Sequence, residues 1–97
     1  LGTERLGAVS DMLKCLSHPI RLSVVDLLSQ HEELCVSELQ HRIEIEQAVL
    51  SQHLALMYDK NILNKKRSGK QIFYFLKQPK FVEIVKLILE CSECDTL

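Results

Sequence analysis

Apolar residues recur every three to four positions near the start of the chain. One such set lies on a single face at helical spacing: Leu6, Val9, Met12, Leu13 and Leu16. The polar segment Ser17-His18-Pro19 interrupts the pattern, and a proline suits the first turn of a helix. We therefore expect one helix that ends near Leu16 and a second helix over Pro19–Gln30.

A shorter helical pattern follows a polar connection. Leu34-Cys35-Val36 is a brief apolar run, and Ser37 comes directly after it. Serine is a favoured residue at the position that caps a helix N-terminus. The pattern predicts that Ser37 caps a short helix at residues 38–42.

A tight link at residues 43–45 leads into a longer helix at 46–60. Leu50, Leu54 and Met57 are spaced i, i+4 and i+7, so they share one face of that helix and are expected to point inward. The opposite positions hold polar side chains. Two helices joined by so short a link predict a helix-turn-helix.

The period of the pattern then changes from that of a helix to that of a strand. Residues 62–67 and Gln71–Leu76 are two strand candidates, and Ser68-Gly69-Lys70 between them is a turn signal. Pro79 begins a last helix, whose apolar residues form a wide stripe: Phe81, Ile84, Val85, Ile88 and Leu89.

These elements predict a mainly α-helical fold, with about five helices and a two-stranded β-hairpin. Helix-turn-helix followed by a hairpin is the order of a winged helix-turn-helix. A chain of 97 residues is enough for one domain and too short for two. We expect residues 1–97 to form a single winged-helix domain.

Charge is distributed unevenly along the chain. The formal net charge is only −1, yet seven of the twelve basic residues lie within residues 60–82, which contain no acid. In isolation such a run would usually be an ordinary solvated surface. Around the hairpin it favours a local patch that faces a polyanion.

The longer helix and the basic hairpin together fit duplex DNA. The B-DNA major groove admits one helix, and Gln or Ser side chains on it can bond base edges. We expect Gln47, Ser51 and Gln52 to do so, with His53 a polar surface residue beside the groove. Cationic side chains on the hairpin would meet phosphates; the candidates are Lys65, Lys66, Arg67 and Lys70.

Two other classes of function compete with DNA binding. An enzyme is disfavoured because no phosphate loop, nucleophile elbow or metal-hydrolase motif is present. A winged-helix module that binds only proteins is the alternative, because fold does not determine function. The acid-free stretch at the hairpin favours DNA over that alternative.

Four motifs, in order, resemble those of a known family. They are LSHPIRL at 16–22, ELCVSEL at 33–39, QAVLSQHL at 47–54 and GKQIFY at 69–74. They lie within the stretch from Leu13 to Leu76, which is about two thirds of the chain. This region resembles the ArsR–SmtB family of bacterial metal- and stress-sensing transcriptional repressors.

The resemblance implies a homodimer in which the first and last helices pair across a two-fold axis. The wide apolar stripe of the last helix supports a partner independently, because it exceeds what one small core needs. A two-fold dimer would bind an imperfect palindrome, with its recognition helices about one DNA turn, roughly 34 Å, apart. The family represses by blocking a promoter until an inducer binds.

Cysteine usage leaves the inducer open. Relatives that sense soft metals carry further cysteines where Ser37 and Gln40 stand here, so this chain retains only Cys35 of that pattern. A second family site uses Asp and His on the last helix, and residues 81–91 contain no histidine. Cys91 and Cys94 are spaced i, i+3, as in redox and ligand pairs.

Three interpretations of these thiols therefore remain. One is a redox or reactive-sulfur switch, another is a metal or metalloid site of two or three thiolates, and the third is no sensing chemistry. No cofactor is expected to be required for DNA binding. The N-terminal residues lack a signal core, and no apolar run approaches the ~18 residues of a membrane helix. We expect a cytoplasmic protein with reduced thiols and no membrane contact.

Overall fold

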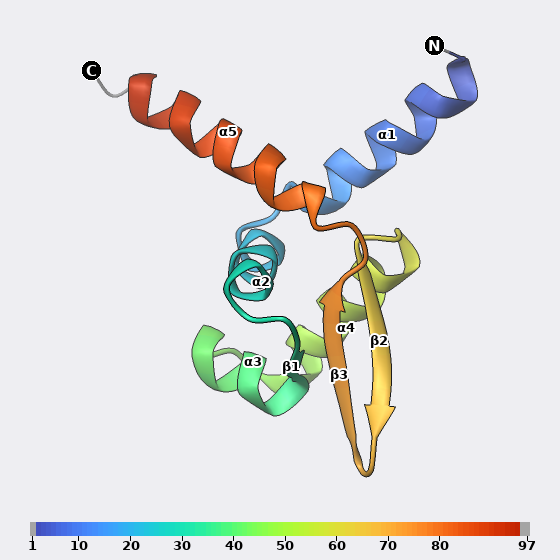
Figure 1. Cartoon of the computed structure of the whole chain (residues 1–97), viewed down its shortest axis with the longest axis vertical. Helices are drawn as coiled ribbons and strands as arrows, with labels where there is room; N and C mark the ends of the chain where they lie inside the picture. The colour runs from blue at the N-terminus through green and yellow to red at the C-terminus, as the bar shows by residue number, and fades with distance from the viewer. Residues whose placement is uncertain (1, 96–97) are drawn as a thin grey trace.

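The computed structural model describes residues 2–95, with side chains from 2 to 91. Five helices and three strands follow one another along this part of the chain (Figure 1). In order they are α1 (Thr3–Leu16), α2 (Pro19–Gln30), β1 (Leu34–Cys35), α3 (Val36–Ile43), α4 (Gln47–Asp59), β2 (Leu63–Ser68), β3 (Gln71–Leu76) and α5 (Lys80–Asp95). The predicted winged helix-turn-helix architecture is confirmed.

The sheet has one strand more than the two predicted. Its order is β1-β3-β2, and both pairs are antiparallel. Leu34 pairs with Tyr74 and Cys35 with Phe73, so the apolar run before α3 adds a short third strand to the hairpin. A two-residue strand is too short to show an alternating pattern, which explains why only its apolar character is visible in the sequence.

The start of α2 follows from the His18-Pro19 pair. The His18 Nδ1 atom accepts a hydrogen bond from the backbone N–H of Ile20, 3.1 Å away. Pro19 occupies the first turn, where its missing N–H has no cost. The predicted bounds of this helix, Pro19–Gln30, are confirmed.

The expected cap of the next helix is wrong. The helix α3 begins at Val36, and Cys35 is its N-cap rather than Ser37. Glu38 explains the earlier start, because its Oε1 accepts a hydrogen bond from the Cys35 backbone N–H at 3.1 Å, as in a capping box. Ser37 lies within the first turn, with its Oγ 3.2 Å from the Cys35 Sγ.

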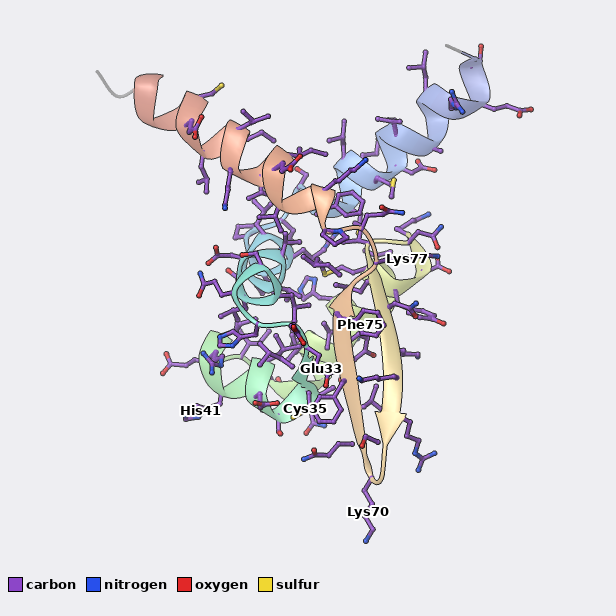
Figure 2. The ribbon with its side chains drawn as sticks, viewed as in Figure 1. Glu33, Cys35, His41, Lys70, Phe75 and Lys77 are labelled. Carbon is purple, nitrogen blue, oxygen red and sulfur yellow. The ribbon has the colours of Figure 1, made fainter. Side chains whose placement is uncertain are left out.

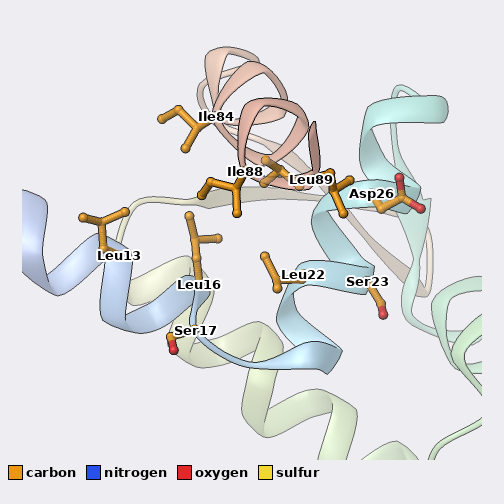
Figure 3. A pocket seen from close by; sticks show the side chains of 10 residues that line it. Leu13, Leu16, Ser17, Leu22, Ser23, Asp26, Ile84, Ile88 and Leu89 are labelled. Atoms are coloured by element: carbon orange, nitrogen blue, oxygen red, sulfur yellow. The ribbon is translucent and has the colours of Figure 1, made fainter. Parts of the chain in front are cut away.

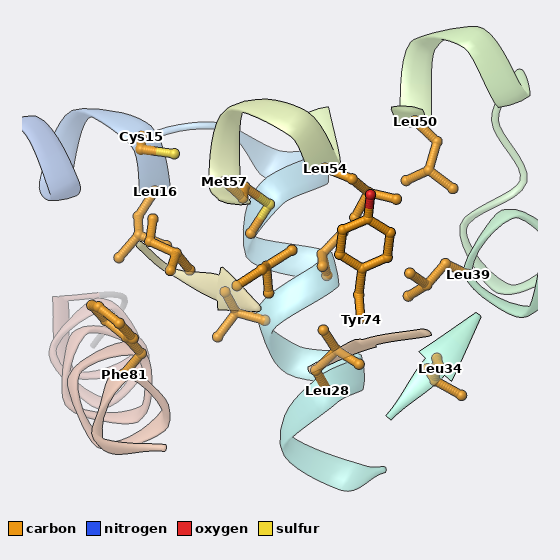
Figure 4. Close-up of a cluster of buried hydrophobic side chains, with 14 residues drawn as sticks. Cys15, Leu16, Leu28, Leu34, Leu39, Leu50, Leu54, Met57, Tyr74 and Phe81 are labelled. Carbon is orange, nitrogen blue, oxygen red and sulfur yellow. The ribbon is translucent and has the colours of Figure 1, made fainter. Parts of the chain in front are cut away.

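One apolar core joins α2, α3, α4 and the sheet (Figure 4). Leu50, Leu54 and Met57 are fully buried, which confirms the inward face predicted for α4. Leu39 of α3 and Tyr74 of β3 belong to the same buried cluster. Fully burying a side chain of this size is worth about 1.5–3 kcal/mol, so the core holds α4 firmly against the body.

The outer helices leave the body in different directions. Figure 1 shows α1 and α5 diverging from the same end of the molecule, opposite the tip of the β2–β3 hairpin. Their inner ends reach the core through buried Cys15 and Leu16 on α1 and Phe81 on α5, with the half-buried Met12 and Val85 packed against it. Among the described side chains of both helices, several large apolar residues are exposed in this chain alone: Leu6, Val9, Leu13, Ile84, Leu87, Ile88 and Leu89.

Candidate nucleic-acid interface

The link between α3 and α4 positions the polar face of α4. Glu44 ends α3 in the left-handed conformation (φ 59°, ψ 49°), and its N–H donates to the Gln40 carbonyl at 2.8 Å. Extended backbone at Glu46 then starts α4. Because the two helices are joined so closely and share buried leucines, the orientation of α4 is fixed by the core.

The outer face of α4 is polar and accessible. Gln47, Ser51 and Gln52 are all exposed. Of the three, Gln52 lies opposite the buried leucines, and Gln47 is the first residue of the helix. These side chains offer amide and hydroxyl groups that both donate and accept hydrogen bonds. Base contacts by these side chains stay a prediction, for which their accessibility is a precondition.

His53 is half-buried rather than free on the surface. Its Nδ1 accepts a hydrogen bond from the Arg21 Nε at 3.2 Å, and its ring centroid lies 4.5 Å from that of His18. Burial lowers the pKa of His53 from its usual 6.5, and the nearby His18 and Arg21 lower it further. The neutral imidazole is therefore the form this site favours.

A compact turn carries the chain from α4 into the hairpin. Asn61 adopts a left-handed conformation (φ 65°), its N–H bonds the Tyr58 carbonyl, and the Ile62 N–H bonds the Met57 carbonyl. This is the Schellman arrangement that satisfies the last carbonyls of a helix. Ile62 is fully buried beside it, so the start of β2 is anchored next to the end of α4.

The hairpin projects as a wing. Ser68 pairs with Gln71, which leaves Gly69 and Lys70 as the two-residue loop. Gly69 has φ 63°, a left-handed conformation that glycine adopts without a side-chain penalty. Figure 2 shows Lys70 extending from the tip, well away from the body.

The four predicted wing cations have four different environments. Lys65 lies over the Tyr58 ring of α4, with its Nζ 4.4 Å from the ring centroid. Arg67, two positions along the strand and so on the same face, donates from Nε to the Gly69 carbonyl at 3.2 Å. Lys66 is on the other face, and its Nζ lies 2.7 Å from Glu33 Oε2. The exposed Lys70 completes the set.

Comparison with known proteins identifies the family. The model of the bacterial regulatory protein arsR family matches residues 18–65, from the start of α2 into β2. The transcriptional repressor PagR of Bacillus anthracis is 35% identical over 79 residues, which cover 81% of this chain and 79% of that protein. This chain belongs to the arsR family.

Other relatives agree in sequence and structure. The biofilm growth-associated repressor of Xylella fastidiosa is 39% identical over 85 residues, covering 88% of this chain and 74% of that protein. The crystal structure of the repressor BigR from Xylella fastidiosa superposes with a TM-score of 0.81 at 38% identity, over 91% of this chain and 89% of that one. As an arsR-family member the chain is a DNA-binding transcriptional regulator, not an enzyme.

Sequence reasoning missed the partners of the interface residues. Tyr58, Glu33 and Arg21 each contact a predicted DNA-binding side chain from a different element. Tyr58 and Lys65 are seven positions apart, whereas Arg21 and His53 are 32 apart. Pairs this distant depend on how α2 packs on α4, and no periodicity in the sequence signals them.

The cysteines of this arsR-family chain are dispersed. Cys15 and Cys35 are buried, while Cys91 is exposed on α5. Figure 1 shows the outer part of α5 leading away from β1, where Cys35 lies. The side chain of Cys94 is outside the described residues. Among side chains 2–91 no three His, Cys, Asp or Glu residues gather as a metal site would require.

Among residues 2–95, no helix combines the length and the apolar character needed to cross a bilayer.

Proposed function

We propose that this protein is a homodimeric repressor that inserts α4 into the major groove and lays the β2–β3 wing on the flanking backbone. One observation carries the proposal: α4 is held by its buried leucines so that Gln47, Ser51 and Gln52 face outward beside a wing bearing Lys65 and other cations. A glutamine can bond adenine at two atoms, which gives base selectivity. Wing cations supply the salt-dependent contribution to affinity.

The proposed dimer interface is formed by α1 and α5. Leu13 on α1 and Leu87 and Ile88 on α5 are 50%, 61% and 59% exposed, an unusual state for such large apolar residues. Between the two helices and α2 lies an apolar groove of about 530 Å³ (Figure 3). A second copy would cover both stripes and the groove in one two-fold contact.

Such a dimer explains the proposed operator and the proposed repression. Two-fold symmetry presents two α4 helices to one face of the duplex, about one helical turn apart, so the operator is an imperfect palindrome. Occupancy of a promoter by this dimer blocks transcription. Because the chromosome is the target, the proposed site of action is the bacterial cytoplasm.

The proposed inducer acts on thiols, either by oxidation or reactive sulfur or as a soft metal or metalloid ion. Cys91 is the thiol among the described side chains that solvent reaches, and it lies on the proposed dimer helix α5. Cys94 is one turn further along the same helix. Modification there would change the dimer and so the spacing of the two α4 helices. Cys35 is buried at the α3 cap and requires local opening first.

The proposal is tested by fluorescence anisotropy of the reduced, metal-free protein. The probe is the duplex upstream of its own gene, compared with a scrambled duplex at two salt concentrations. Tight, salt-sensitive binding that prefers the native duplex supports the proposal. If neither this duplex nor a random-sequence selection pool yields a preferred site, the proposal of sequence-specific DNA binding is rejected. The alternative, a winged-helix module that binds only proteins, then replaces it.

Substitutions then test the assignment of the bases. Gln47→Ala and Gln52→Ala should each weaken specific binding by about 1–3 kcal/mol, because each removes base-edge hydrogen bonds. Binding to the scrambled duplex should change little. Gln78→Ala, at an exposed glutamine between β3 and α5, is the matched control. Equal effects of all three variants would reject α4 as the recognition helix.

The inducer is tested by repeating the assay with diamide, polysulfide, cadmium and arsenite. A sensor on α5 is supported if a reagent releases DNA from wild type and from Cys15→Ser but no longer releases it from Cys91→Ser or Cys94→Ser. If Cys35→Ser is the one variant from which the reagent no longer releases DNA, sensing is assigned to the α3 cap. Binding that survives every reagent would reject a thiol inducer while leaving DNA binding intact.

A further inference from the structure

Arg21 links three helices through two hydrogen bonds. Its Nη1 donates to the Cys15 carbonyl at 2.8 Å, in the last turn of α1. Its Nε donates to His53 Nδ1 at 3.2 Å, on α4. The side chain itself belongs to α2 and is half-buried. One guanidinium therefore connects the C-terminus of α1 to the middle of α4.

The contact with α1 uses a group that the helix leaves unsatisfied. The last four carbonyls of a helix have no partner within it, and a cation near them is favourable. The planar guanidinium can donate in two directions at once, which a lysine ammonium on a flexible stem does less well. The contact with His53 needs Nδ1 without a proton, because only the unprotonated nitrogen accepts a hydrogen bond.

The surroundings of His53 oppose its protonation. His18 faces it from the start of α2, and the His18 Nδ1 is itself an acceptor for the Ile20 N–H. From α1 the nearby group is the uncharged Cys15 carbonyl, held by Arg21. On α4 the residues one turn away, at 49, 50, 56 and 57, are all apolar. Over the described side chains, the single ion pair is Lys66–Glu33, so no carboxylate neutralises this cluster.

We infer that Arg21 is a positioning residue that ties α4 to the end of α1, and that the tie holds only while His53 is neutral. The inference rests on the proposed function, in which α1 belongs to the dimer interface and α4 contacts bases. Under that function, Arg21 sets the angle between the dimer axis and the recognition helix. Protonation of His53 places a second cation against Arg21 and removes the acceptor.

The consequence is specific DNA binding that weakens in mild acid. The lowered pKa of His53 supports the geometry, because it shows that the folded site disfavours the charged ring. General electrostatics act in the opposite direction, since added positive charge strengthens binding to any duplex. The added charge affects operator and scrambled duplex alike, so it cancels in the ratio of the two affinities. A change in this affinity ratio therefore reports the positioning of α4.

The first test compares Arg21→Ala with Arg5→Ala, a control that removes the same charge from an exposed position on α1. At pH 8 we expect Arg21→Ala to lower the affinity ratio about tenfold, from the lost charge-assisted hydrogen bonds. The slope of log affinity against log salt should stay unchanged, because Arg21 touches no phosphate. Lys70→Ala, at the wing tip, should instead reduce the slope by about one.

A second test uses spectroscopy and needs neither DNA nor a stable alanine variant. Nitrogen-15 NMR of the wild-type histidines should show His53 as the Nε2–H tautomer, with a titration below the usual histidine range. In Arg21→Lys, which keeps the charge and the fold, that tautomer preference should be lost and the affinity ratio should fall between those of wild type and Arg21→Ala. Circular dichroism and sedimentation confirm that each variant is folded and dimeric.

The pH profile completes the test. As the pH is lowered from 8, the wild-type affinity ratio should stay constant down to pH 6.5 and fall below it, because the pKa of His53 is lowered from that value. The ratio of Arg21→Ala should be low and flat over the same range. A wild-type ratio that stays constant below pH 6.5 as well, an Arg21→Lys protein identical to wild type, or an altered salt slope in Arg21→Ala would each overturn the inference. A wild type with no operator preference at pH 8 would overturn the proposed function as well.

Discussion

The ammonium of Lys66 lies 2.7 Å from the carboxylate of Glu33, so one of the four wing cations is already paired within the protein. The pair joins β2 to the segment that precedes β1, across the width of the sheet. Its side chains are 56% and 36% exposed, and pairs this accessible add about 0–1 kcal/mol to stability. Its larger effect concerns DNA binding, because Lys66 can neutralise a phosphate only after its ion pair with Glu33 is broken.

Releasing that lysine should strengthen DNA binding. Glu33→Gln frees Lys66 to contact a phosphate. The slope of log operator affinity against log salt concentration is then expected to become more negative by up to about one. Glu32→Gln removes the same charge from a neighbouring exposed position without touching the wing, and serves as the control. Anisotropy titrations from 50 to 300 mM salt, roughly the range where such slopes are measurable, compare the two. Identical slopes would mean that Glu33 acts through net charge alone.

The wing turn should depend on glycine at a single position. Gly69 has φ 63°, and an added Cβ would meet no atom within 4 Å, so the cost of Gly69→Ala is conformational, about 1–2 kcal/mol. Gly7 lies inside α1 with equally open space, where Gly7→Ala should stabilise by about 0.5–1 kcal/mol. Thermal unfolding of both variants measures the two changes in stability. Equal shifts in the same direction would contradict the turn geometry.

Much of the fold follows from local pattern. The bounds of α2 and β3 match the sequence prediction, because a histidine–proline start marks the helix and a glycine turn marks the strand. The helix α4 was placed within one residue at each end, by the spacing of its buried leucines. The start of α3 was missed because cysteine is not among the residues favoured at an N-cap.

The candidate site was predictable only in part. Exposure of Gln52 follows from the helical period, since it lies opposite the core leucines. Gln47 is spaced i, i+3 and i+7 from Leu50 and Leu54, and it is exposed at the first residue of the helix. The state of Lys66 and of His53 does not follow, because Glu33 and Arg21 reach them through tertiary packing. Sequence pattern therefore located the surface, and the structure assigned different surroundings to side chains that look equivalent in the sequence.

The apolar stripe of α5 should control assembly. Ile88→Asp places a carboxylate in the proposed dimer interface, where a buried isoleucine is worth about 1.5–3 kcal/mol in each copy. We expect the dimer dissociation constant to rise at least about a hundredfold, and operator affinity to fall with it. Sedimentation velocity over a concentration series measures the first effect.

The matched control lies on the other side of the same helix. Lys86→Asp adds the same carboxylate to a charged stripe that also holds Glu83 and Glu90, so it should leave the dimer intact. Far-ultraviolet circular dichroism checks that α5 remains helical in both variants. A monomeric Lys86→Asp protein, or a dimeric Ile88→Asp protein, would show that another surface forms the dimer.

Acid should destabilise the α3 cap only at a pH below that at which ordinary glutamates titrate. The hydrogen bond from the Cys35 backbone N–H lowers the pKa of Glu38 from 4.5, and a hydrogen bond with the Cys35 side chain and the charges of Arg42 and His31 act in the same direction. The folded state therefore favours the carboxylate. Its contribution to stability is complete above pH 4.5 and is lost as pH falls through the lower folded-state pKa.

Glu38→Gln tests this contribution. The amide keeps an acceptor but no charge, so the variant should be less stable than wild type near pH 7 and should approach it as pH falls below 4. Urea unfolding between pH 7 and pH 3 measures the difference, with Glu32→Gln as a control at a glutamate that makes no cap. A difference that stayed constant over the whole range would show that the cap depends on the shape of the side chain and not on its charge.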